Sequence, residues 1–307
     1  MTKILITEYM DSDAVEDLTA SYDVIYDPDL VEDRARILAL LPTAEALIVR
    51  NRTQVDTALL DHAPHLKVIG RLGVGLDNID LAAAAERKIA VCPASGANAD
   101  SVAEYVLTAM MLLWRPVYHH QDAMREGAFP RNALSHGREI GGKTLTLIGG
   151  GVIGQAVMSR ALAMGMNILV VDPALSTPPH PDAQLVSFEE GLKRADVVSL
   201  HIPLIDATRN LIDAAALQFM KPSALIINTA RGGIIDHAAL SAALRAGKLG
   251  GAAIDVFPQE PASAQDMSLF AGLENIILTP HVAGLTEDAN KRVGSITAQN
   301  VKAHLEK

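Results

Sequence analysis

Three charged or titratable residues near the end of the chain, Arg231, Glu260 and His281, each follow a short apolar run that breaks at Gly or Pro. The runs are residues 224–227, 251–254 and 276–278. Such runs are typical of buried parallel strands, whose carboxyl ends line the ligand crevice of an open α/β sheet. A guanidinium, a carboxylate and an imidazole brought together there suit a 2-oxo acid. Such a set can provide one group that anchors the acid, one that donates a proton and one that tunes the donor.

A glycine-rich turn, Gly149-Gly150-Gly151-Val152-Ile153-Gly154, lies between a predicted strand and a predicted helix. This G-x-G-x-x-G context indicates a dinucleotide site, where backbone N–H groups approach a pyrophosphate at a helix N-terminus. Asp172 ends the next predicted strand, roughly 20 residues further on, where a carboxylate binds the adenine ribose hydroxyls. Residues 173–175 offer no cation for a 2′-phosphate, so we expect NAD. A phosphate-binding loop of the Walker type is excluded because Gln155 stands where Lys is needed.

The composition favours two α/β domains and limits the partners. The chain has 307 residues, 49% of them apolar and only 4% aromatic, and its net charge is −10. That charge argues against nucleic acid or an anionic membrane as a partner. The single cysteine excludes an internal disulfide and a cysteine-based metal cluster, and no metal is expected. The first residues do not resemble a signal peptide and no apolar run reaches membrane-spanning length, so we expect a cytoplasmic protein.

Short apolar strands alternate with amphipathic helices in two series, which predicts two parallel sheets. The first series has strands at residues 3–7, 23–26, 46–49, 67–70 and 89–92. The second series has strands at residues 144–148, 167–171, 196–200, 224–227, 251–254 and 276–278. A helical stretch, rich in Ala, Met and Leu, is predicted between the two series from about residue 101 to residue 125.

Further motifs follow one another in a fixed order along the chain. They are Val74-Gly-Leu-Asp-Asn-Ile-Asp80, Asn98-Ala-Asp-Ser-Val-Ala-Glu104, the glycine-rich turn, Ser199-Leu-His-Ile-Pro-Leu204, Asn228-Thr-Ala-Arg-Gly-Gly233, Asp255-Val-Phe, Glu260-Pro and Pro280-His281. With these motifs the chain resembles, nearly end to end, the NAD-dependent D-isomer-specific 2-hydroxyacid dehydrogenases, in the branch similar to 3-phosphoglycerate dehydrogenase. Several motifs in the right order are far more specific than any one alone.

The resemblance implies a role for each site residue. Arg231 would hold the substrate carboxylate and carbonyl oxygen, His281 would donate the proton, and Glu260 would orient the imidazole and favour its protonated form. Asp255 would lie near the nicotinamide carboxamide. The implied cofactor-binding residues are Gly149, Gly151, Val152, Ile153, Gly154, Asp172, His201, Pro203, Thr208, Thr229, Ala230, Asp255, His281 and Gly284.

On the substrate side, the resemblance makes Arg50 a contact, and the implied substrate-binding residues are Arg50, Leu72, Gly73, Val74, Gly75, Arg231 and His281. The N–H groups of the loop from Leu72 to Gly75 could form an anion-binding nest. Arg71 and Arg131 are expected to be surface residues. A cluster of cations favours a substrate with a second anion, and the candidates are phosphohydroxypyruvate, hydroxypyruvate, glyoxylate and sulfopyruvate.

The family fold implies two Rossmann-like or flavodoxin-like domains with a cleft between them. The substrate domain would comprise residues 1–97 and 285–307, and the NAD-binding domain residues 98–284. The long helices after Ser101 would build a homodimer. Two alternatives remain open: an NAD(H)-sensing, corepressor-like binding protein with the same fold, and a relative that acts on formate or phosphite.

Overall fold

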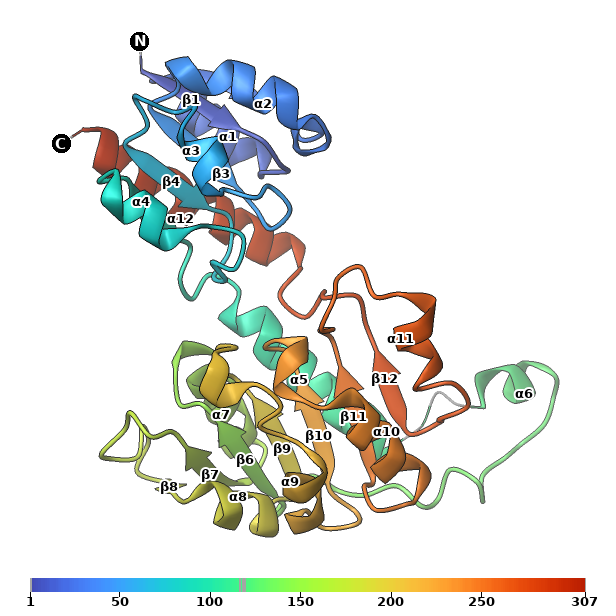
Figure 1. Cartoon of the computed structure of the whole chain (residues 1–307). Helices are drawn as coiled ribbons and strands as arrows, with labels where there is room; N and C mark the ends of the chain where they lie inside the picture. Colours follow the sequence, from blue (N-terminus) through green and yellow to red (C-terminus); the bar gives the residue numbers. More distant parts are fainter. Residues whose placement is uncertain (1, 116, 118–119, 307) are drawn as a thin grey trace. The chain divides into compact units, whose positions relative to one another are not determined.

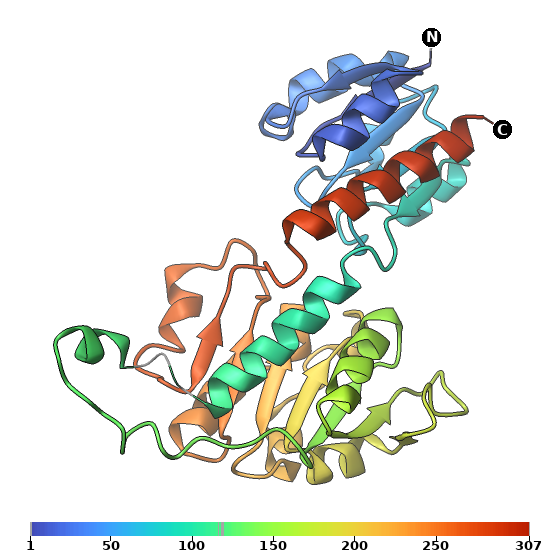
Figure 2. The ribbon, with the colours of Figure 1, turned by 180° about the vertical axis from the view of Figure 1, so that it is seen from behind.

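The computed structural model describes residues 2–115, 117 and 120–306 (Figures 1 and 2). It divides into two compact units, which we call unit 1 (Met1–Asn98 with Leu285–Lys307) and unit 2 (Ala99–Gly284). Each unit has one sheet in which all strands run parallel, with helices on both faces. The predicted α/β class with two parallel sheets is therefore confirmed. Among the described residues, no helix is both long and apolar enough to cross a membrane.

Unit 1 contains a five-stranded sheet in the order β2-β1-β3-β4-β5. Its strands are β1 (Lys3–Ile6), β2 (Asp23–Tyr26), β3 (Ala46–Val49), β4 (Val68–Arg71) and β5 (Ala90–Pro93). Its helices are α1 (Ser12–Thr19), α2 (Arg34–Leu40), α3 (Thr57–Leu60), α4 (Leu81–Glu86) and α12 (Glu287–Leu305), with the short 3₁₀ turns η1 (Leu30–Glu32) and η2 (Leu41–Thr43). Ile4 and Ile6 pack with α1 and α12, whereas Leu5 packs with α2, α3 and α4, because successive strand residues point to opposite faces.

Local sequence explains where the helices of unit 1 begin. An aspartate precedes each of α1 to α4, and its carboxylate accepts a hydrogen bond from an N–H group of the first helical turn. The four residues are Asp11, Asp33, Asp56 and Asp80. Such a cap stabilises a helix by about 1 kcal/mol, because the first N–H groups have no partner within the helix.

Unit 2 contains a seven-stranded sheet in the order β12-β11-β10-β9-β6-β7-β8. Its strands are β6 (Thr144–Ile148), β7 (Asn167–Val171), β8 (Ala183–Leu185), β9 (Val197–Leu200), β10 (Leu225–Asn228), β11 (Gly251–Ile254) and β12 (Ile276–Leu278). Its helices are α5 (Ala99–Trp114), α6 (Gln121–Arg125), α7 (Val152–Ala163), α8 (Phe188–Arg194), α9 (Ala214–Phe219), α10 (His237–Arg245) and α11 (Ala264–Ser268), with η3 (Asp206–Thr208) and η4 (Gly232–Ile234).

The helices of unit 2 cover the two faces of its sheet. Val197 and Ile227 pack on the face of α5 and α7, whereas Val198 and Ile226 pack on the face of α8, α9 and α10. Figure 2 shows α5 crossing in front of the strands on the first of these faces. Both faces are buried, which explains why the strands are almost uniformly apolar.

The helical stretch predicted over residues 101–125 is divided into two helices in the structure. Helix α5 begins at Ala99 and ends at Trp114, and a separate short helix, α6, follows at Gln121–Arg125. The sequence has a proline at position 116, and a proline disfavours helical conformation in the residue before it and clashes with the preceding turn. The apolar composition of the stretch concealed this break.

In each sheet the order of strand addition reverses at one place. In unit 1 the reversal lies between β1 and β3, and in unit 2 between β6 and β9. Ligands of open α/β sheets bind at the carboxyl ends of the strands at such a point. Glu8 and Arg50 follow β1 and β3, while Gly149 and His201 follow β6 and β9. Each unit therefore presents candidate site residues where its topology favours a ligand.

Candidate active site

His281 and Glu260 form the centre of the candidate site in unit 2. The Nδ1 atom of His281 lies 2.7 Å from Oε2 of Glu260. Glu260 comes from the loop after β11 and His281 from the loop after β12, and these neighbouring strands end at the same edge of the sheet. The two side chains are 43% and 35% exposed, so a substrate can reach the imidazole.

The charge of Glu260 determines which nitrogen of His281 carries the hydrogen of this bond. Burial alone would raise the pKa of Glu260, but hydrogen bonds from His281 and the Phe257 N–H, with the nearby charge of Arg231, lower the pKa below its ordinary value. The carboxylate is therefore ionised at neutral pH and acts as the acceptor. Nδ1 is then the donor, and Nε2 is left as the nitrogen that can exchange a proton with a substrate.

Arg231 lies beside this pair, in the loop between β10 and η4. Its Nη1 donates to the carbonyl of Ala230 at 2.6 Å. The side chain of Asn228 accepts the N–H of Ala230 and donates to the carbonyl of Arg231. Gly232 follows, and a side chain there would lie 2.0 Å from the backbone of Phe257. The loops that carry Arg231 and Glu260 are thus in direct contact, which brings together the three residues predicted from the sequence.

Asp255, at the end of β11, organises the loop that carries His281. Its side chain is fully buried, and its carboxylate accepts from Thr279 Oγ1 at 2.6 Å, from the Val282 N–H at 2.8 Å and from the Ala283 N–H at 2.9 Å. Its own carbonyl accepts the N–H of His281 at 2.7 Å. In this structure the Asp255 carboxylate is therefore hydrogen-bonded to the loop that follows β12. Its predicted contact with a nicotinamide stays a prediction.

The glycine-rich turn joins β6 to α7 as the dinucleotide fingerprint requires. Gly149 has a φ of +104°, and a side chain there would lie 2.4 Å from the carbonyl of His201. A side chain at Gly154 would lie 2.2 Å from the carbonyl of Gly149. At Gly151, which precedes α7, an added carbon would meet no atom of the described residues within 4 Å. The turn is thus closed on its protein side and open at the helix N-terminus, where an anion is favoured.

The other predicted cofactor residues of unit 2 lie in loops at the carboxyl ends of its strands. Asp172 accepts the Gly150 N–H at 2.8 Å and the Ala174 N–H at 3.0 Å, so it also shapes the glycine-rich turn. The Thr208 hydroxyl donates to the carbonyl of Pro203 at 2.7 Å and closes that loop. Thr229 has a buried hydroxyl with no hydrogen-bond partner in the described part of the chain, which fits a polar group of a cofactor. Ala230 and Gly284 lie in the Arg231 and His281 loops.

His201 is not suited to acid catalysis. Burial lowers its pKa to about 4, so the imidazole is neutral at neutral pH. Its Nε2 lies 2.9 Å from the hydroxyl of Ser199, and its carbonyl lies against Gly149. These contacts give it a part in shaping the predicted cofactor site.

In unit 1, Arg50 is the predicted residue with the most defined surroundings. Its Nη2 donates to Oδ1 of Asn290 at 3.0 Å, and its guanidinium lies 5.9 Å from the ring centre of Tyr9. Burial lowers the pKa of Arg50, and this effect is larger than the opposing effect of the Glu8 charge. Glu8, only 4% exposed, accepts the N–H groups of Arg50, Arg52 and Thr53 at 2.9 to 3.1 Å. The buried carboxylate holds the loop from which Arg50 projects.

The loop from Leu72 to Gly75 offers fewer free donors than the sequence suggested. The N–H groups of Leu72 and Gly73 already bond the carbonyls of Val49 and Arg71, each at 2.8 Å. Within the described part of the chain, only the N–H groups of Val74 and Gly75 in this loop make no hydrogen bond. Arg71, expected on the surface, instead donates to the carbonyl of Leu72 at 2.7 Å, and its guanidinium would collide with any side chain at Gly73. Arg131 is exposed, as expected.

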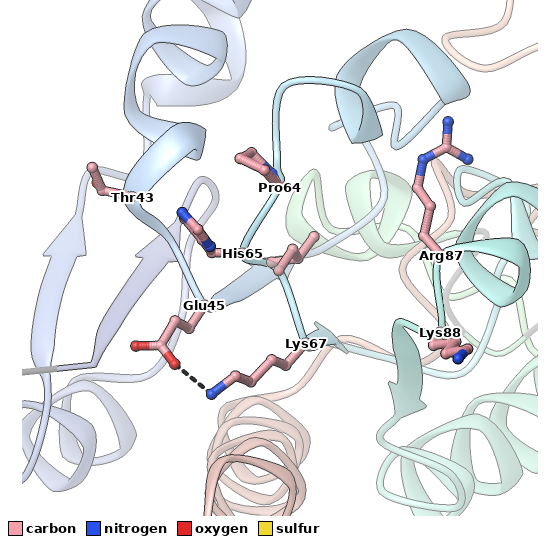
Figure 3. Close-up of a pocket in the computed structure, with 8 residues that line it drawn as sticks. Thr43, Glu45, Pro64, His65, Lys67, Arg87 and Lys88 are labelled. Carbon is pink, nitrogen blue, oxygen red and sulfur yellow. Dashed lines mark hydrogen bonds and ion pairs between the residues drawn. The ribbon is translucent and has the colours of Figure 1, made fainter.

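A pocket lies at the opposite edge of the unit 1 sheet (Figure 3). The loops before β3, β4 and β5 line it with Thr43, Glu45, Pro64, His65, Leu66, Lys67, Arg87 and Lys88. Glu45 and Lys67 form an ion pair at 2.6 Å, drawn as a dashed line in Figure 3. Because these residues precede their strands, they lie at the amino edge, away from the ligand-binding edge of a parallel sheet. None of the predicted site residues lines this pocket.

Sequence reasoning missed four residues that support the site: Glu8, Asn78, Tyr105 and Thr279. Glu8 had a usable signal, since it is a charged residue directly after a buried strand, as Arg231 is. Asn78 lies in the motif from Val74 to Asp80 but was given no role there, and in the structure it donates to the carbonyl of Thr53 at 2.7 Å. Tyr105 and Thr279 had no signal, because their contact joins residues that are distant in the sequence. Among the described residues, no group of three or more His, Cys, Asp or Glu side chains could hold a metal ion.

Three comparisons place this geometry among known proteins. A sequence model for "D-isomer specific 2-hydroxyacid dehydrogenase, NAD binding domain" matches residues 107–283. An (S)-sulfolactate dehydrogenase of Chromohalobacter salexigens is 48% identical over 311 residues, which cover 99% of each chain. A D-3-phosphoglycerate dehydrogenase of Methanocaldococcus jannaschii is 40% identical over 308 residues, 98% of this chain and 57% of that one, so the present chain spans little more than half its length. The crystal structure of the TT0316 protein from Thermus thermophilus matches with a TM-score of 0.90 at 35% identity, covering 99% of this chain and 97% of the other.

Proposed function

This chain belongs to the D-isomer specific 2-hydroxyacid dehydrogenases, and we propose that its substrate is a 2-oxo acid with a second anionic group. The family predicted from the sequence is confirmed. The protein is an NAD-dependent oxidoreductase that interconverts a 2-hydroxy acid and its 2-oxo acid. The alternative of a nucleotide-sensing binding protein is set aside, since the two relatives described above are named as dehydrogenases.

The observation that carries the proposed chemistry is the 2.7 Å bond between His281 Nδ1 and the ionised Glu260. We propose that Nε2 of His281 gives its proton to the carbonyl oxygen of the 2-oxo acid during reduction and takes it back during oxidation. Arg231 holds the substrate carboxylate through its planar guanidinium. NAD(H), when bound, supplies or accepts the hydride. General acid–base assistance of this kind contributes about 10²- to 10⁴-fold in rate.

Unit 2 is proposed to bind the cofactor, with the predicted boundary at residues 98–284. The pyrophosphate is assigned to the N–H groups of the turn from Gly149 to Gly154, and the adenine ribose to Asp172. The open space at Gly151 and the buried, unpartnered hydroxyl of Thr229 support this assignment. The proposed contacts further include Val152, Ile153, His201, Pro203, Thr208, Ala230, Asp255, His281 and Gly284.

Residues 1–97 and 285–307 are proposed to form the substrate domain, with contacts from Arg50, Leu72, Gly73, Val74 and Gly75. The second anion is assigned to Arg50, whose guanidinium is held by Asn290 and Tyr9. The N–H groups of Val74 and Gly75 add two donors. A sulfonate is the first candidate for this anion, because the relative named for sulfolactate is similar over its whole length.

The product of sulfopyruvate reduction would carry the label S even with the geometry of a D-2-hydroxy acid. The sulfur atom raises the priority of the CH₂SO₃⁻ group above that of the carboxylate, so the label changes while the arrangement of the groups does not. We therefore expect (S)-sulfolactate from sulfopyruvate and an R product from hydroxypyruvate, which lacks sulfur.

The test is the oxidation of NADH, followed by absorbance, with a panel of 2-oxo acids and chiral analysis of the products. The panel contains sulfopyruvate, phosphohydroxypyruvate, hydroxypyruvate, glyoxylate and pyruvate, and NAD reduction is assayed with formate and phosphite. We expect kcat/KM to be highest for a substrate with two anions. A preference for pyruvate or glyoxylate would contradict the second-anion proposal. His281→Gln should lose about 10²-fold or more in turnover while retaining NADH affinity.

We also propose that the protein is a homodimer that acts in the cytoplasm. Apolar residues are exposed on α5 and α6 and in the segments between and after these helices, with Met111 38%, Val117 40%, Met124 43% and Phe129 78% exposed. Burying these residues against a second copy would be favourable. A single cysteine and dependence on NAD support the compartment.

A further inference from the structure

A chain of hydrogen bonds leads from helix α5 to the loop that carries His281. The hydroxyl of Tyr105 lies 2.5 Å from Oγ1 of Thr279, which in turn donates to Oδ1 of Asp255 at 2.6 Å. The single proton of the Thr279 hydroxyl is used toward Asp255, so the phenol of Tyr105 is the donor of the first bond. Burial raises the pKa of Tyr105, and the phenol therefore keeps this proton at neutral pH. All three residues belong to unit 2.

Asp255, at the end of this series of hydrogen bonds, holds the backbone of His281 and of the two residues after it. Asp255 accepts the His281 N–H with its carbonyl, and the N–H groups of Val282 and Ala283 with its carboxylate. His281 has a φ of +57°, a conformation that is unfavourable for residues other than glycine. Such a conformation persists only where the surroundings determine it. The Asp255 carboxylate provides those surroundings, and it is itself fully buried.

We propose that Thr279 and Tyr105 are positioning residues for the proton donor His281 and that they act through Asp255. The inference rests on the proposed role of His281. Glu260 holds the imidazole at Nδ1, whereas the chain from Tyr105 holds the backbone from which the imidazole projects. Loss of the Thr279 hydroxyl would remove one of the hydrogen bonds to the buried Asp255 carboxylate, and the carboxylate could then rotate. A displacement of about 1 Å in a reacting group costs about 10²-fold in rate.

Three variants separate positioning from stability. Thr279→Val removes the hydroxyl and keeps the shape, Thr279→Ser keeps the hydroxyl, and Tyr105→Phe removes only the first donor. We expect Thr279→Val to lower kcat about 10- to 100-fold, Tyr105→Phe to lower it by a smaller factor, and Thr279→Ser to stay within about threefold of the wild type. NADH affinity, measured by fluorescence, should change little in all three. Tyr26→Phe in unit 1, which loses a bond to Met10, is the matched control and should retain kcat.

A kinetic isotope effect adds a readout that general loss of stability would not change. With NADH deuterated at the transferred hydrogen, Thr279→Val should show a larger effect on kcat than the wild type, because a misplaced acid slows the chemical step. Equal kcat and equal isotope effects in Thr279→Val and the wild type would overturn the inference. If Thr279→Val does not fold, Tyr105→Phe decides the question, and wild-type kcat in that variant would overturn the inference as well.

His281→Gln distinguishes failure of this inference from failure of the proposed function. Normal turnover in His281→Gln would remove His281 as the acid, and the positioning role would fall with it. Loss of turnover in His281→Gln together with normal turnover in Thr279→Val and Tyr105→Phe would leave the proposed function intact and refute the positioning role alone. A parallel loss of NADH affinity in Thr279→Val and Tyr105→Phe would instead assign these residues to cofactor binding and refute the inference.

Discussion

Glu260 is ionised although it is half-buried, because it is surrounded by donors and positive charge. The donors are the His281 imidazole and the Phe257 N–H, and the positive charge is that of Arg231. The ionised carboxylate accepts the hydrogen on Nδ1 of His281, which orients the imidazole and leaves Nε2 as the nitrogen that can face a substrate. At the scale of single residues, the charge of Glu260 therefore connects the geometry of the pair to the nitrogen that can exchange a proton.

Replacing Glu260 by Gln should lower the rate. The amide can still accept a hydrogen bond from His281, but it no longer carries the negative charge of the carboxylate. For 2-oxo acid reduction, we expect kcat to fall about 10- to 100-fold. Glu274→Gln, at an exposed position of the same unit, is the control and should retain kcat. An unchanged kcat in Glu260→Gln would show that the carboxylate charge does not act on the proton donor.

At the scale of elements, the partly buried carboxylate of Asp196 joins the starts of two strands in unit 2. Asp196, just before β9, accepts the Thr144 N–H at the start of β6 and the Lys221 ammonium, each at 2.9 Å. Burial acts to raise the pKa of Asp196, but these bonds outweigh it and lower the pKa from 3.8. The pKa is thus lower in the folded than in the unfolded chain. The resulting stabilisation is present above the unfolded pKa and is lost as the pH falls through the folded pKa.

Asp196→Asn should therefore lower the free energy of unfolding at neutral pH by about 1–3 kcal/mol. Below about pH 4 the difference from the wild type should shrink, because the wild-type carboxyl also takes up a proton. Urea unfolding of both proteins, at neutral pH and below pH 4, measures the difference in the free energy of unfolding. Asp182→Asn, with a carboxylate that is 76% exposed, should change the stability by less than about 0.5 kcal/mol. A constant difference between wild type and Asp196→Asn across this range would contradict the linkage.

Elements differed in how far the sequence predicted them. The strands that end at Ile148, Val171 and Leu200 were predicted closely, because buried parallel strands are continuous apolar runs between turns. The end of α5 at Trp114 was not predicted, because the composition of the stretch stays apolar beyond Trp114 and hides the effect of the following proline. Strand β8 was not predicted, because its three residues carry too little pattern.

At the scale of the whole molecule, the proposed dimer can be tested by the molecular mass in solution and by substitution of exposed apolar residues. Sedimentation equilibrium at micromolar concentration should give twice the 32.6 kDa chain mass. Phe129→Ser combined with Met124→Ser should shift the equilibrium toward the monomer, because both side chains expose apolar area on one segment. Phe219→Ser on α9, 37% exposed, serves as the control. A wild-type protein that sediments as a single chain would refute the dimer.

The sequence by itself determined the chemistry. The informative features were local in the sequence. They were the residue types at Arg231, Glu260 and His281, the spacing of the glycines before α7, and the apolar runs that precede these residues. The tertiary structure decided which residues serve these groups. It paired Tyr105 with Thr279, 174 positions apart, and turned the Asp255 carboxylate toward the His281 loop. It also brought the Glu8 carboxylate to the N–H of Arg50. In the loop predicted to bind an anion, the N–H groups of Leu72 and Gly73 were found bonded to backbone carbonyls. Such partnerships depend on strand order and loop packing, which bring distant residues together and which no local pattern encodes.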